Sequence, residues 1–289
     1  MEDFDVCVIG AGYGGATVAA LLAHAGRRVA LIEKTARAGG KTQTTERKGY
    51  HFEMFGAVGI PALNSRFHEL VETLGIAARV PFVVPAGDAA SVRYKAPDGT
   101  WRSMRMPLIA SGSPQEMENL KRVYGIGDEE LTALGNFYGA LFAVDDAQLA
   151  ALENVGMFEW MGQFGLARPL ESQICMNLNT LFVVAVDRLA ASEAIPVLRA
   201  QVLGGAGRYH LGGYGRVAEA CAEYVTGHGG CYFTKCRARR IAVENGRAVG
   251  VRLDDGRTIE AENVLSSAGV VETLGLLPKL DNAAPKPAE

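Results

Sequence analysis

Two short apolar runs near the N-terminus, residues 6–9 and 29–32, contain no polar residue. Such runs, bounded by turn residues, are typical of parallel strands that are buried on both faces. The segment between them, residues 13–25, is rich in alanine and leucine, and we expect it to form a helix. The start of the chain therefore predicts a strand–helix–strand unit.

From residue 61 the apolar positions repeat with the period of amphipathic helices or alternate as in strands. Residues 66–74 predict a helix with Ser65 as its N-cap. Segments 91–96 and 100–106 flank a turn signal, so they predict an antiparallel hairpin. The remaining pattern predicts a strand at 80–84, a helix that begins at Ser113-Pro114, and helices over 128–152, 157–163, 170–184 and 193–202.

The last third of the chain returns to glycine-rich turns and strands. Glycines cluster in residues 204–215, and residues 214–227 predict a helix. Asn245-Gly246 and Asp255-Gly256 are strong hairpin signals. The elements predicted here are a short strand at 231–234, a three-stranded meander of 238–244, 247–253 and 257–261, a further buried strand that runs into a glycine turn over 261–269, and a helix at 271–277.

The glycine spacing after the first apolar run suits a dinucleotide. Gly10 allows a tight turn, Gly12 lets the backbone approach a pyrophosphate, and Gly15 lets the helix pack closely on the strand. The helix N-terminus offers free N–H groups and the positive end of the helix dipole to phosphates. Glu33 ends the second run, where a carboxylate can accept hydrogen bonds from ribose hydroxyls. The alternative is a glycine-rich turn that binds no ligand.

A basic loop with two adjacent glycines follows Glu33. Gly39 and Gly40 let backbone N–H groups reach a phosphate or the edge of a flavin. Arg37 and Lys41 can neutralise a pyrophosphate. The loop is not typical of simple NAD-dependent dehydrogenases, and its alternative is an ordinary solvated basic loop.

The complete pattern is G-x-G-x-x-G, then seventeen residues, Glu33, five more residues and Gly-Gly-Lys. It resembles the pattern of two-dinucleotide-binding flavoproteins, in particular the phytoene desaturase and amine oxidase superfamily. In that family the second motif usually ends in Gly-Gly-Arg, and Lys41 stands in place of the arginine. Residues 42–60 resemble the family's next element, where an acid and a glycine lie beside the flavin. Glu53 and Gly56 occupy those places.

The resemblance implies FAD as the cofactor. It covers residues 1–60 and 204–277 well and the middle of the chain weakly. In the family, the position that matches Ala238 reads the adenine through its backbone, and the turn that matches Ala268 and Gly269 passes near the pyrophosphate. The cofactor-binding residues expected here are Gly10, Gly12, Tyr13, Gly14, Gly15, Glu33, Lys34, Arg37, Gly39, Gly40, Lys41, Gly56, Ala57, Ala238, Ala268 and Gly269.

The predicted fold class is α/β. A Rossmann-like FAD-binding domain with a β-meander would carry an inserted, mainly helical α+β substrate domain. We expect the first part of the FAD-binding domain in residues 1–60, the substrate domain in 61–206, the second part of the FAD-binding domain in 207–278, and a disordered polar tail in 279–289.

Composition narrows the function further. The net charge of −3 gives no electrostatic reason to expect nucleic-acid binding. No apolar run approaches the roughly 20 residues of a membrane span, and the acidic start does not resemble a signal peptide. Five scattered cysteines form no C-x-x-C pair, which favours reduced thiols and a cytoplasmic location. We find no cluster with the spacing of metal ligands.

One family feature has no counterpart in the sequence. Related flavoenzymes return through a late glycine-rich motif that holds the ribityl chain and faces the flavin ring, and no such motif follows residue 277. Three explanations remain open: a split enzyme with the remainder on a second polypeptide, a truncated fragment, or a short member that binds FAD loosely or serves as a scaffold. Missing strands would expose edges and apolar surface, so we expect a partner chain that completes the flavin site and the sheet.

The function expected is that of an FAD-dependent oxidoreductase, or one subunit of a hetero-oligomer. It would transfer hydride between FAD and a small-molecule substrate, which would be apolar, as in desaturases and saturases, or an amine. The alternatives are a non-catalytic FAD- or nucleotide-binding subunit that stabilises a partner, and a plain NAD-binding dehydrogenase. The catalytic residues stay unknown: His51, Glu53, Tyr209 and His210 are candidates for proton transfer or ring contact, or ordinary packing and turn residues.

Overall fold

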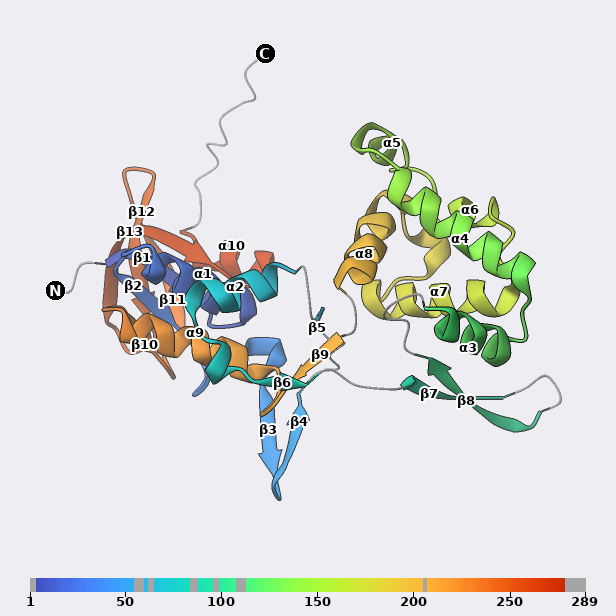
Figure 1. Ribbon diagram of the computed structural model, residues 1–289. Helices are drawn as coiled ribbons and strands as arrows, with labels where there is room; N and C mark the ends of the chain where they lie inside the picture. Colours follow the sequence, from blue (N-terminus) through green and yellow to red (C-terminus); the bar gives the residue numbers. More distant parts are fainter. Residues whose placement is uncertain are drawn as a thin grey trace, which may run out of the picture. The chain divides into compact units, whose positions relative to one another are not determined.

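The chain divides into two compact units. The computed structural model describes residues 4–54, 60–61, 65–83, 88–95, 99–107, 113–204 and 207–278 (Figure 1). The first unit combines 1–57, 69–83 and 209–289, and the second combines 58–68 and 84–208. The first unit is therefore built from both ends of the chain. The tail that we expected to be disordered, 279–289, lies outside the described residues.

The first unit is built on a six-stranded sheet with the order β10-β2-β1-β13-β12-β11. β10, β2, β1 and β13 run parallel, and β13, β12 and β11 form an antiparallel meander. The prediction of a mixed α/β fold with a parallel sheet is therefore confirmed. The strands are β1 (Phe4–Ile9), β2 (Val29–Ile32), β10 (Cys231–Phe233), β11 (Ala238–Glu244), β12 (Arg247–Leu253) and β13 (Thr258–Ser266).

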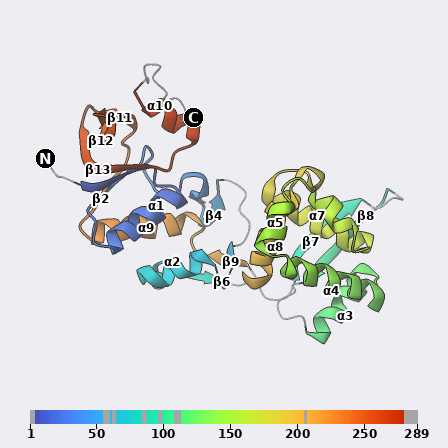
Figure 2. The same ribbon diagram turned by 90° about the horizontal axis from the view of Figure 1, so that it is seen from above.

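Helices cover one face of the parallel strands, and the meander folds over their other face. Figure 2 shows α1 (Tyr13–His24) and α9 (Gly215–Gly227) side by side on one face, with β11, β12 and α10 (Val270–Leu276) on the opposite side. On that side, alternate residues of the parallel strands, including Cys7, Ile9 and Ile32, share a buried hydrophobic cluster with residues of the meander. Burial on both faces explains the continuous apolar runs of β1 and β2.

The strand β13 corrects one prediction. Two strands, 257–261 and 261–269, were expected from the sequence, whereas one continuous strand spans Thr258–Ser266. Its first half pairs antiparallel with β12, and its second half pairs in parallel with β1. A strand of nine residues has room for a different partner along each half, so no break in the chain is needed.

Shorter elements surround the sheet in the first unit. After β2 the chain forms a 3-10 turn, η1 (Gly40–Thr42), and a hairpin of β3 (Thr44–Arg47) and β4 (Tyr50–Glu53). The strand expected at 80–84 is present but shorter, as the two-residue strand β6 (Phe82–Val83), and a 3-10 turn, η2 (Ala77–Arg79), precedes it. β9 (Gly207–His210) spans the division between the units: its second half pairs with β6 in the first unit, and its first half pairs with β5 (Ile60–Pro61) in the second.

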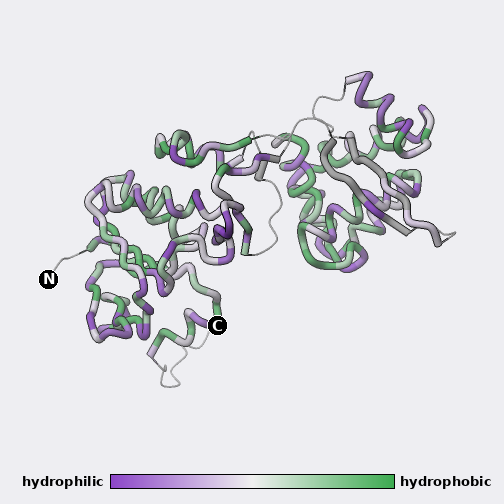
Figure 3. Tube along the Cα trace, turned by 90° about the horizontal axis from the view of Figure 1, so that it is seen from below, coloured by the Kyte–Doolittle hydropathy of each residue, from purple (hydrophilic) through white to green (hydrophobic). Residues whose placement is uncertain are grey.

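The second unit is mainly helical. The predicted hairpin is present as β7 (Asp88–Lys95) and β8 (Trp101–Pro107). The helices of the second unit carry both hydrophobic and hydrophilic residues, as expected of helices with one buried face (Figure 3). The helices that follow the hairpin are α3 (Pro114–Tyr124), α4 (Asp128–Ala143), α5 (Asp146–Ala151), α6 (Met157–Gly162), α7 (Arg168–Phe182) and α8 (Ala191–Gly204), with η3 (Val186–Arg188) between α7 and α8. α2 (Arg66–Leu74) spans the division between the units and begins with Ser65 accepting a hydrogen bond from the His68 N–H.

The single helix expected over 128–152 is also corrected. The structure has two helices, α4 and α5, because a new N-cap interrupts the segment at Asp145. The Asp145 carboxylate accepts a hydrogen bond from the Gln148 N–H at 2.8 Å, and the Gln148 side chain accepts one from the Asp145 N–H at 2.9 Å. This capping box fixes the start of a helix. The D-x-x-Q signal was present in the sequence.

Candidate cofactor site

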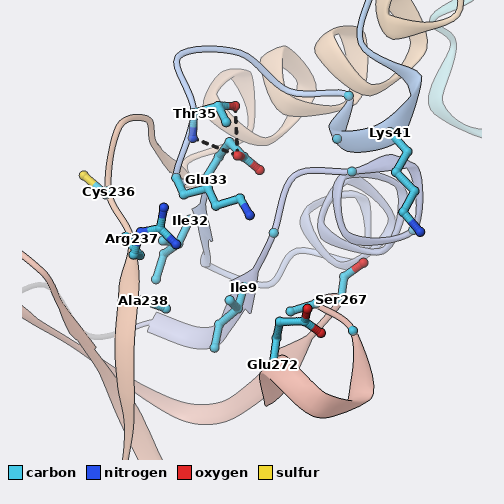
Figure 4. A pocket seen from close by; sticks show the side chains of 18 of the residues that line it. Ile9, Ile32, Glu33, Thr35, Lys41, Cys236, Arg237, Ala238, Ser267 and Glu272 are labelled. Carbon is cyan, nitrogen blue, oxygen red and sulfur yellow. Dashed lines mark hydrogen bonds between the residues drawn. The ribbon is translucent and has the colours of Figure 1, made fainter. Parts of the chain in front are cut away.

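A cavity of about 900 Å³ opens at the carboxyl ends of β1, β2 and β13, within the first unit (Figure 4). Ligands of open parallel sheets bind at this end of the strands. The volume lies within the usual range for small-molecule and cofactor sites. The lining residues are Ile9, Gly10, Gly12, Tyr13, Gly14, Ile32, Glu33, Lys34, Thr35, Gly39, Gly40, Lys41, Thr42, Gln43, Cys236, Arg237, Ala238, Arg239, Ser267, Ala268, Gly269, Glu272, Gly275 and Leu276.

The glycine-rich turn forms one wall of the cavity. Gly10 has a φ of +94°, which only glycine adopts without strain, and its N–H donates to the Ile32 carbonyl at 2.8 Å. Gly15 does not line the cavity. A Cβ at Gly15 would overlap the Gly10 carbonyl oxygen, so the absence of a side chain lets α1 lie close to the end of β1. Gly15 therefore has the packing role that its spacing predicted.

The second glycine pair packs directly against the first turn. The Gly39 N–H donates to the Ala11 carbonyl at 2.8 Å, and Gly39 forms an isolated parallel bridge with Gly12. A Cβ on Gly40 would lie 3.1 Å from the Gly12 α-carbon. Gly39 and Gly40 also have φ values of +121° and +56°. The pair is needed to bring two backbone segments together at the mouth of the cavity.

Glu33 lies at the end of β2 and is only 5% exposed. Its Oε2 accepts a hydrogen bond from the Ala11 N–H at 2.9 Å, and its Oε1 accepts from the Thr35 N–H at 2.8 Å and the Thr35 hydroxyl at 2.9 Å. A carboxylate has about four acceptor positions. The protein therefore leaves one acceptor position of Glu33 unused, and Glu33 lines the cavity, which suits a ribose hydroxyl.

The charges around the cavity are mostly positive. Lys34, Lys41, Arg237 and Arg239 line it together with the acids Glu33 and Glu272. The first turn of α1 reads Tyr-Gly-Gly-Ala and carries no acid. Its N–H groups point along the helix axis at the end where an α-helix leaves them without partners inside the helix. An anionic group is favoured at this place.

Most of the residues predicted to bind the cofactor come together in this cavity, and a few do not. Arg37 lies outside it, and its guanidinium pairs with Glu219 of α9 at 2.6 Å. Gly56 and Ala57 lie outside the described residues. The predicted residues that line the cavity are Gly10, Gly12, Tyr13, Gly14, Glu33, Lys34, Gly39, Gly40, Lys41, Ala238, Ala268 and Gly269.

Glu53, a candidate for chemistry, caps a helix in the structure. Its Oε1 accepts a hydrogen bond from the Tyr214 N–H at 2.9 Å, and its Oε2 accepts one from the Thr44 hydroxyl at 2.9 Å. Thr44 in turn accepts from the Gly215 N–H at 3.1 Å. A Cβ at Gly213 would overlap the Thr44 side chain. The late glycines thus leave room for the β3–β4 hairpin to cap the N-terminus of α9.

The other polar candidates do not line the cavity either. His51 is exposed on β4, and Tyr209 on β9 is 45% exposed. His210 is buried, with its Nδ1 at 3.2 Å from the Val80 carbonyl oxygen. The four side chains considered for proton transfer therefore lie away from the cavity.

Sequence reasoning missed part of the lining. Several missed residues lie one or two positions from predicted ones, so a wider window around each motif would have found them. Glu272, Gly275 and Leu276 carry no local signal of their own, because only α10 brings them to the cavity. The missed residues are Ile9, Ile32, Thr35, Thr42, Gln43, Cys236, Arg237, Arg239, Ser267, Glu272, Gly275 and Leu276.

These residues fit the adenosine diphosphate part of FAD. The Gly12–Gly40 approach leaves a cradle without side chains, the start of α1 offers N–H donors, and Glu33 keeps one acceptor position for a hydroxyl. When bound, FAD would supply the hydride chemistry, which is a property of the cofactor. The chain's own residues would bind and orient it.

The fold and this cavity define the class of dinucleotide-binding flavoproteins. The family model described as "Flavin containing amine oxidoreductase" matches residues 14–287, and the chain belongs to this family. The resemblance inferred from the glycine and acid spacing is therefore confirmed, as is FAD as the cofactor.

Individual relatives agree with the family. Prolycopene isomerase from Daucus carota, a chloroplastic protein, is 28% identical over 318 residues, which cover 97% of this chain and 48% of that protein. The neurosporene-forming phytoene desaturase of Cereibacter sphaeroides is 26% identical, covering 92% of this chain and 53% of that protein. An oxidoreductase from Methanosarcina mazei has the same fold, with a TM-score of 0.65 at 18% identity over 96% of this chain and 61% of that one.

The chain spans about half the length of the curated relatives it matches. Among the described residues, no helix combines the length and the apolar character needed to cross a membrane. The same residues contain no group of three or more histidine, cysteine, aspartate or glutamate side chains placed to hold a metal ion.

Proposed function

We propose that this chain is the FAD-holding part of an oxidoreductase that transfers hydride between FAD and an apolar small-molecule substrate. The reaction would resemble that of a desaturase or a saturase. The observation that carries the proposal is the cavity built from the Gly10–Gly15 turn, the Gly39–Lys41 turn and Glu33, in a chain whose relatives include a phytoene desaturase and a prolycopene isomerase.

The second unit is proposed as the substrate domain. Its helices have an apolar core of their own, which includes Phe137, Met157, Trp160 and Leu178. The proposal of an apolar substrate is supported by the carotenoid-related names of the relatives. Nothing among the described residues favours one apolar substrate over another.

A partner chain is part of the proposal. In the described part of the chain, the second half of β13 pairs only with β1, and its other edge is open. Next to it, α10 exposes Val270, Val271 and Leu274 by 77%, 80% and 63%. An open strand edge beside an apolar helix face is typical of an interface. Together with the length of the relatives, this supports completion of the flavin site by further polypeptide.

A second candidate function is a non-catalytic FAD-binding subunit that stabilises a partner. It is favoured by one observation: His51, Glu53, Tyr209 and His210 all lie outside the cavity. Both functions require FAD binding, and only the first requires reduction of the flavin by substrate. The cytoplasmic location stays a prediction from cysteine usage.

The test is the visible spectrum of the purified chain, alone and after co-expression with the second half of a related desaturase. We expect the chain alone to bind FAD weakly and to acquire flavin absorption when the second half is present. Glu33→Ala and Gly12→Val should abolish the absorption, because the first removes the ribose acceptor and the second fills the cradle.

Bleaching of the flavin by an apolar polyene under anaerobic conditions would support the oxidoreductase over the non-catalytic subunit. Stable flavin absorption that no substrate bleaches would favour the non-catalytic subunit. A chain that binds no FAD in either setting would overturn both functions.

A further inference from the structure

One acidic residue of the cavity, Glu272, is exposed in the first turn of α10 and, among the residues that the structure describes, makes no side-chain contact that holds it in place. Within the described part of the chain, its carboxylate has neither a hydrogen bond nor an ion pair, whereas both oxygens of Glu33 accept hydrogen bonds. Figure 4 shows Glu272 on α10, pointing into the cavity beside Ser267. A carboxylate next to a phosphate-binding turn weakens anion binding by repulsion, unless the same carboxylate contacts another part of the ligand.

The wall near Glu272 is apolar. Ile9 and Ile32 at the ends of β1 and β2 belong to one buried hydrophobic cluster, against which Ala238 and Leu276 also pack. All four of these residues line the cavity. A planar heterocycle with apolar faces fits such a wall, and the base of a nucleotide lies next to the ribose that Glu33 would hold.

The position of the Glu272 carboxylate depends on the lack of a side chain at Gly269. A Cβ at Gly269 would overlap the Glu272 Oε2, so a side chain there would displace the carboxylate. The displaced group is the end of a flexible side chain, and the backbone need not move. The lack of a side chain at Gly269 therefore leaves the space over this turn to the Glu272 carboxylate.

We propose that Glu272 accepts a hydrogen bond from the exocyclic amino group of adenine and makes the cavity select adenine over 6-oxopurines. This inference rests on the proposed FAD binding. An ionised carboxylate can only accept hydrogen bonds. Adenine has an amino donor where guanine and hypoxanthine have a carbonyl oxygen, so a 6-oxopurine would place one acceptor against another.

The experiment is calorimetric titration of the full chain with ADP and with IDP, its hypoxanthine counterpart. We expect the wild type to bind ADP at least about tenfold more tightly than IDP, the ratio that about 1.4 kcal/mol produces. In Glu272→Gln the ratio should fall toward one, because an amide can accept from the amino group or donate to the carbonyl oxygen. Glu33→Gln is the matched control, and it should weaken both nucleotides while the ratio stays the same.

A second variant moves the Glu272 carboxylate and leaves residue 272 itself unchanged. Gly269→Ala displaces the carboxylate, and it should lower the ADP-to-IDP ratio as Glu272→Gln does. Circular dichroism of each variant checks that the fold is intact.

Three results would overturn the inference. An unchanged ratio in Glu272→Gln would mean that the carboxylate does not contact the base. Equal tightening of both nucleotides would mean that Glu272 acts only by repelling phosphates. A wild type that binds FAD and ADP but does not distinguish ADP from IDP would overturn this inference alone, whereas a wild type that binds neither FAD nor ADP would overturn the proposed function with it.

Discussion

At the scale of single residues, the lack of a side chain at particular glycines is as important to the packing of this protein as the side chains elsewhere. Gly15, Gly40, Gly213 and Gly269 each leave space that a neighbouring backbone or side chain fills. Gly15 and Gly40 face backbone atoms, so their neighbours cannot yield. Gly213 and Gly269 face the side chains of Thr44, Glu53 and Glu272. Substitutions at the first pair should therefore cost more stability than substitutions at Gly269.

Gly15→Ala should lower the free energy of unfolding of the first unit by at least about 3 kcal/mol, because overpacking against a backbone carbonyl cannot relax locally. Urea unfolding followed by circular dichroism measures this. Gly227→Ala is the matched control, since a Cβ there meets nothing within 4 Å, and its effect should lie between zero and a gain of about 1 kcal/mol. Equal effects of the two substitutions would contradict the assigned role of Gly15.

Two buried thiols make stability depend on alkaline pH. Burial raises the pKa of Cys7 and of Cys221 to about 12, from an ordinary value of 9.0. Above pH 9 these thiols ionise in the unfolded chain but stay neutral in the folded one. Their contribution is therefore complete below pH 9 and is lost as the pH rises toward 12, at about 1.4 kcal/mol per pH unit for each thiol.

The measurement is urea unfolding at pH 8 and pH 10 for the wild type and for a variant with both Cys7→Ala and Cys221→Ala. The wild type should lose more stability over this interval than the variant, because all other titrating groups are shared. If both proteins lost the same stability, the thiols would not titrate differently in the folded and unfolded states.

At the scale of elements, contacts between segments far apart in the sequence build the wall of the cavity. The β3–β4 hairpin follows the Gly39–Lys41 turn directly, and it is held by Glu53 and Thr44 against the N-terminus of α9. Arg37, next to the same turn, pairs with Glu219 of α9. These contacts hold the turn at the cavity through a helix that begins about 170 residues later.

Two substitutions of Glu53 should distinguish the contribution of its hydrogen bond to stability from the contribution of its negative charge. Glu53→Ala leaves the Tyr214 N–H without its acceptor, so the free energy of unfolding should fall by about 1–3 kcal/mol. Glu53→Gln keeps an acceptor and loses only the favourable interaction of a negative charge with the helix dipole, which is worth about 0.3–1 kcal/mol. Thermal unfolding of both variants tests this order, and equal losses would show that Glu53 does not cap α9.

At the scale of the whole molecule, the sheet of the first unit ends in a surface that resembles an unfinished core. The second half of β13 is half-buried or exposed, whereas the first half buries alternate residues, and α10 presents three exposed apolar side chains. The chain also spans about half the length of its curated relatives. An added strand and helix would bury this surface.

The exposed face of α10 can be tested in the chain as it is. Val271 is 80% exposed, so Val271→Lys should change the free energy of unfolding by no more than about 0.5 kcal/mol. The same substitution should reduce self-association of the chain in light scattering, because it places a charge on the apolar face. A loss above about 1 kcal/mol would contradict an uncovered face, since it would mean that Val271 is buried in solution.

The sequence by itself determined the strand–helix–strand start, the meander turns and most of the phosphate-binding backbone. Each of these depends on a local requirement, such as glycine at a positive φ or close to another backbone, or Asn-Gly in a hairpin, and local requirements are visible in residue spacing. The helix break at Asp145 was also visible and was missed. The number of residues between the glycine motif and Glu33 predicted the place of this acid at the cavity, again because residue spacing is a local signal.

Only the tertiary structure decided that β13 pairs with both β1 and β12, that Arg37 faces α9 instead of the cavity, that Glu53 caps a helix, and that Glu272 lines the cavity. The physical reason is that a charged side chain has the same local signal whether it binds a ligand, caps a helix or faces solvent. Its role is set by which distant segment the folded sheet brings beside it.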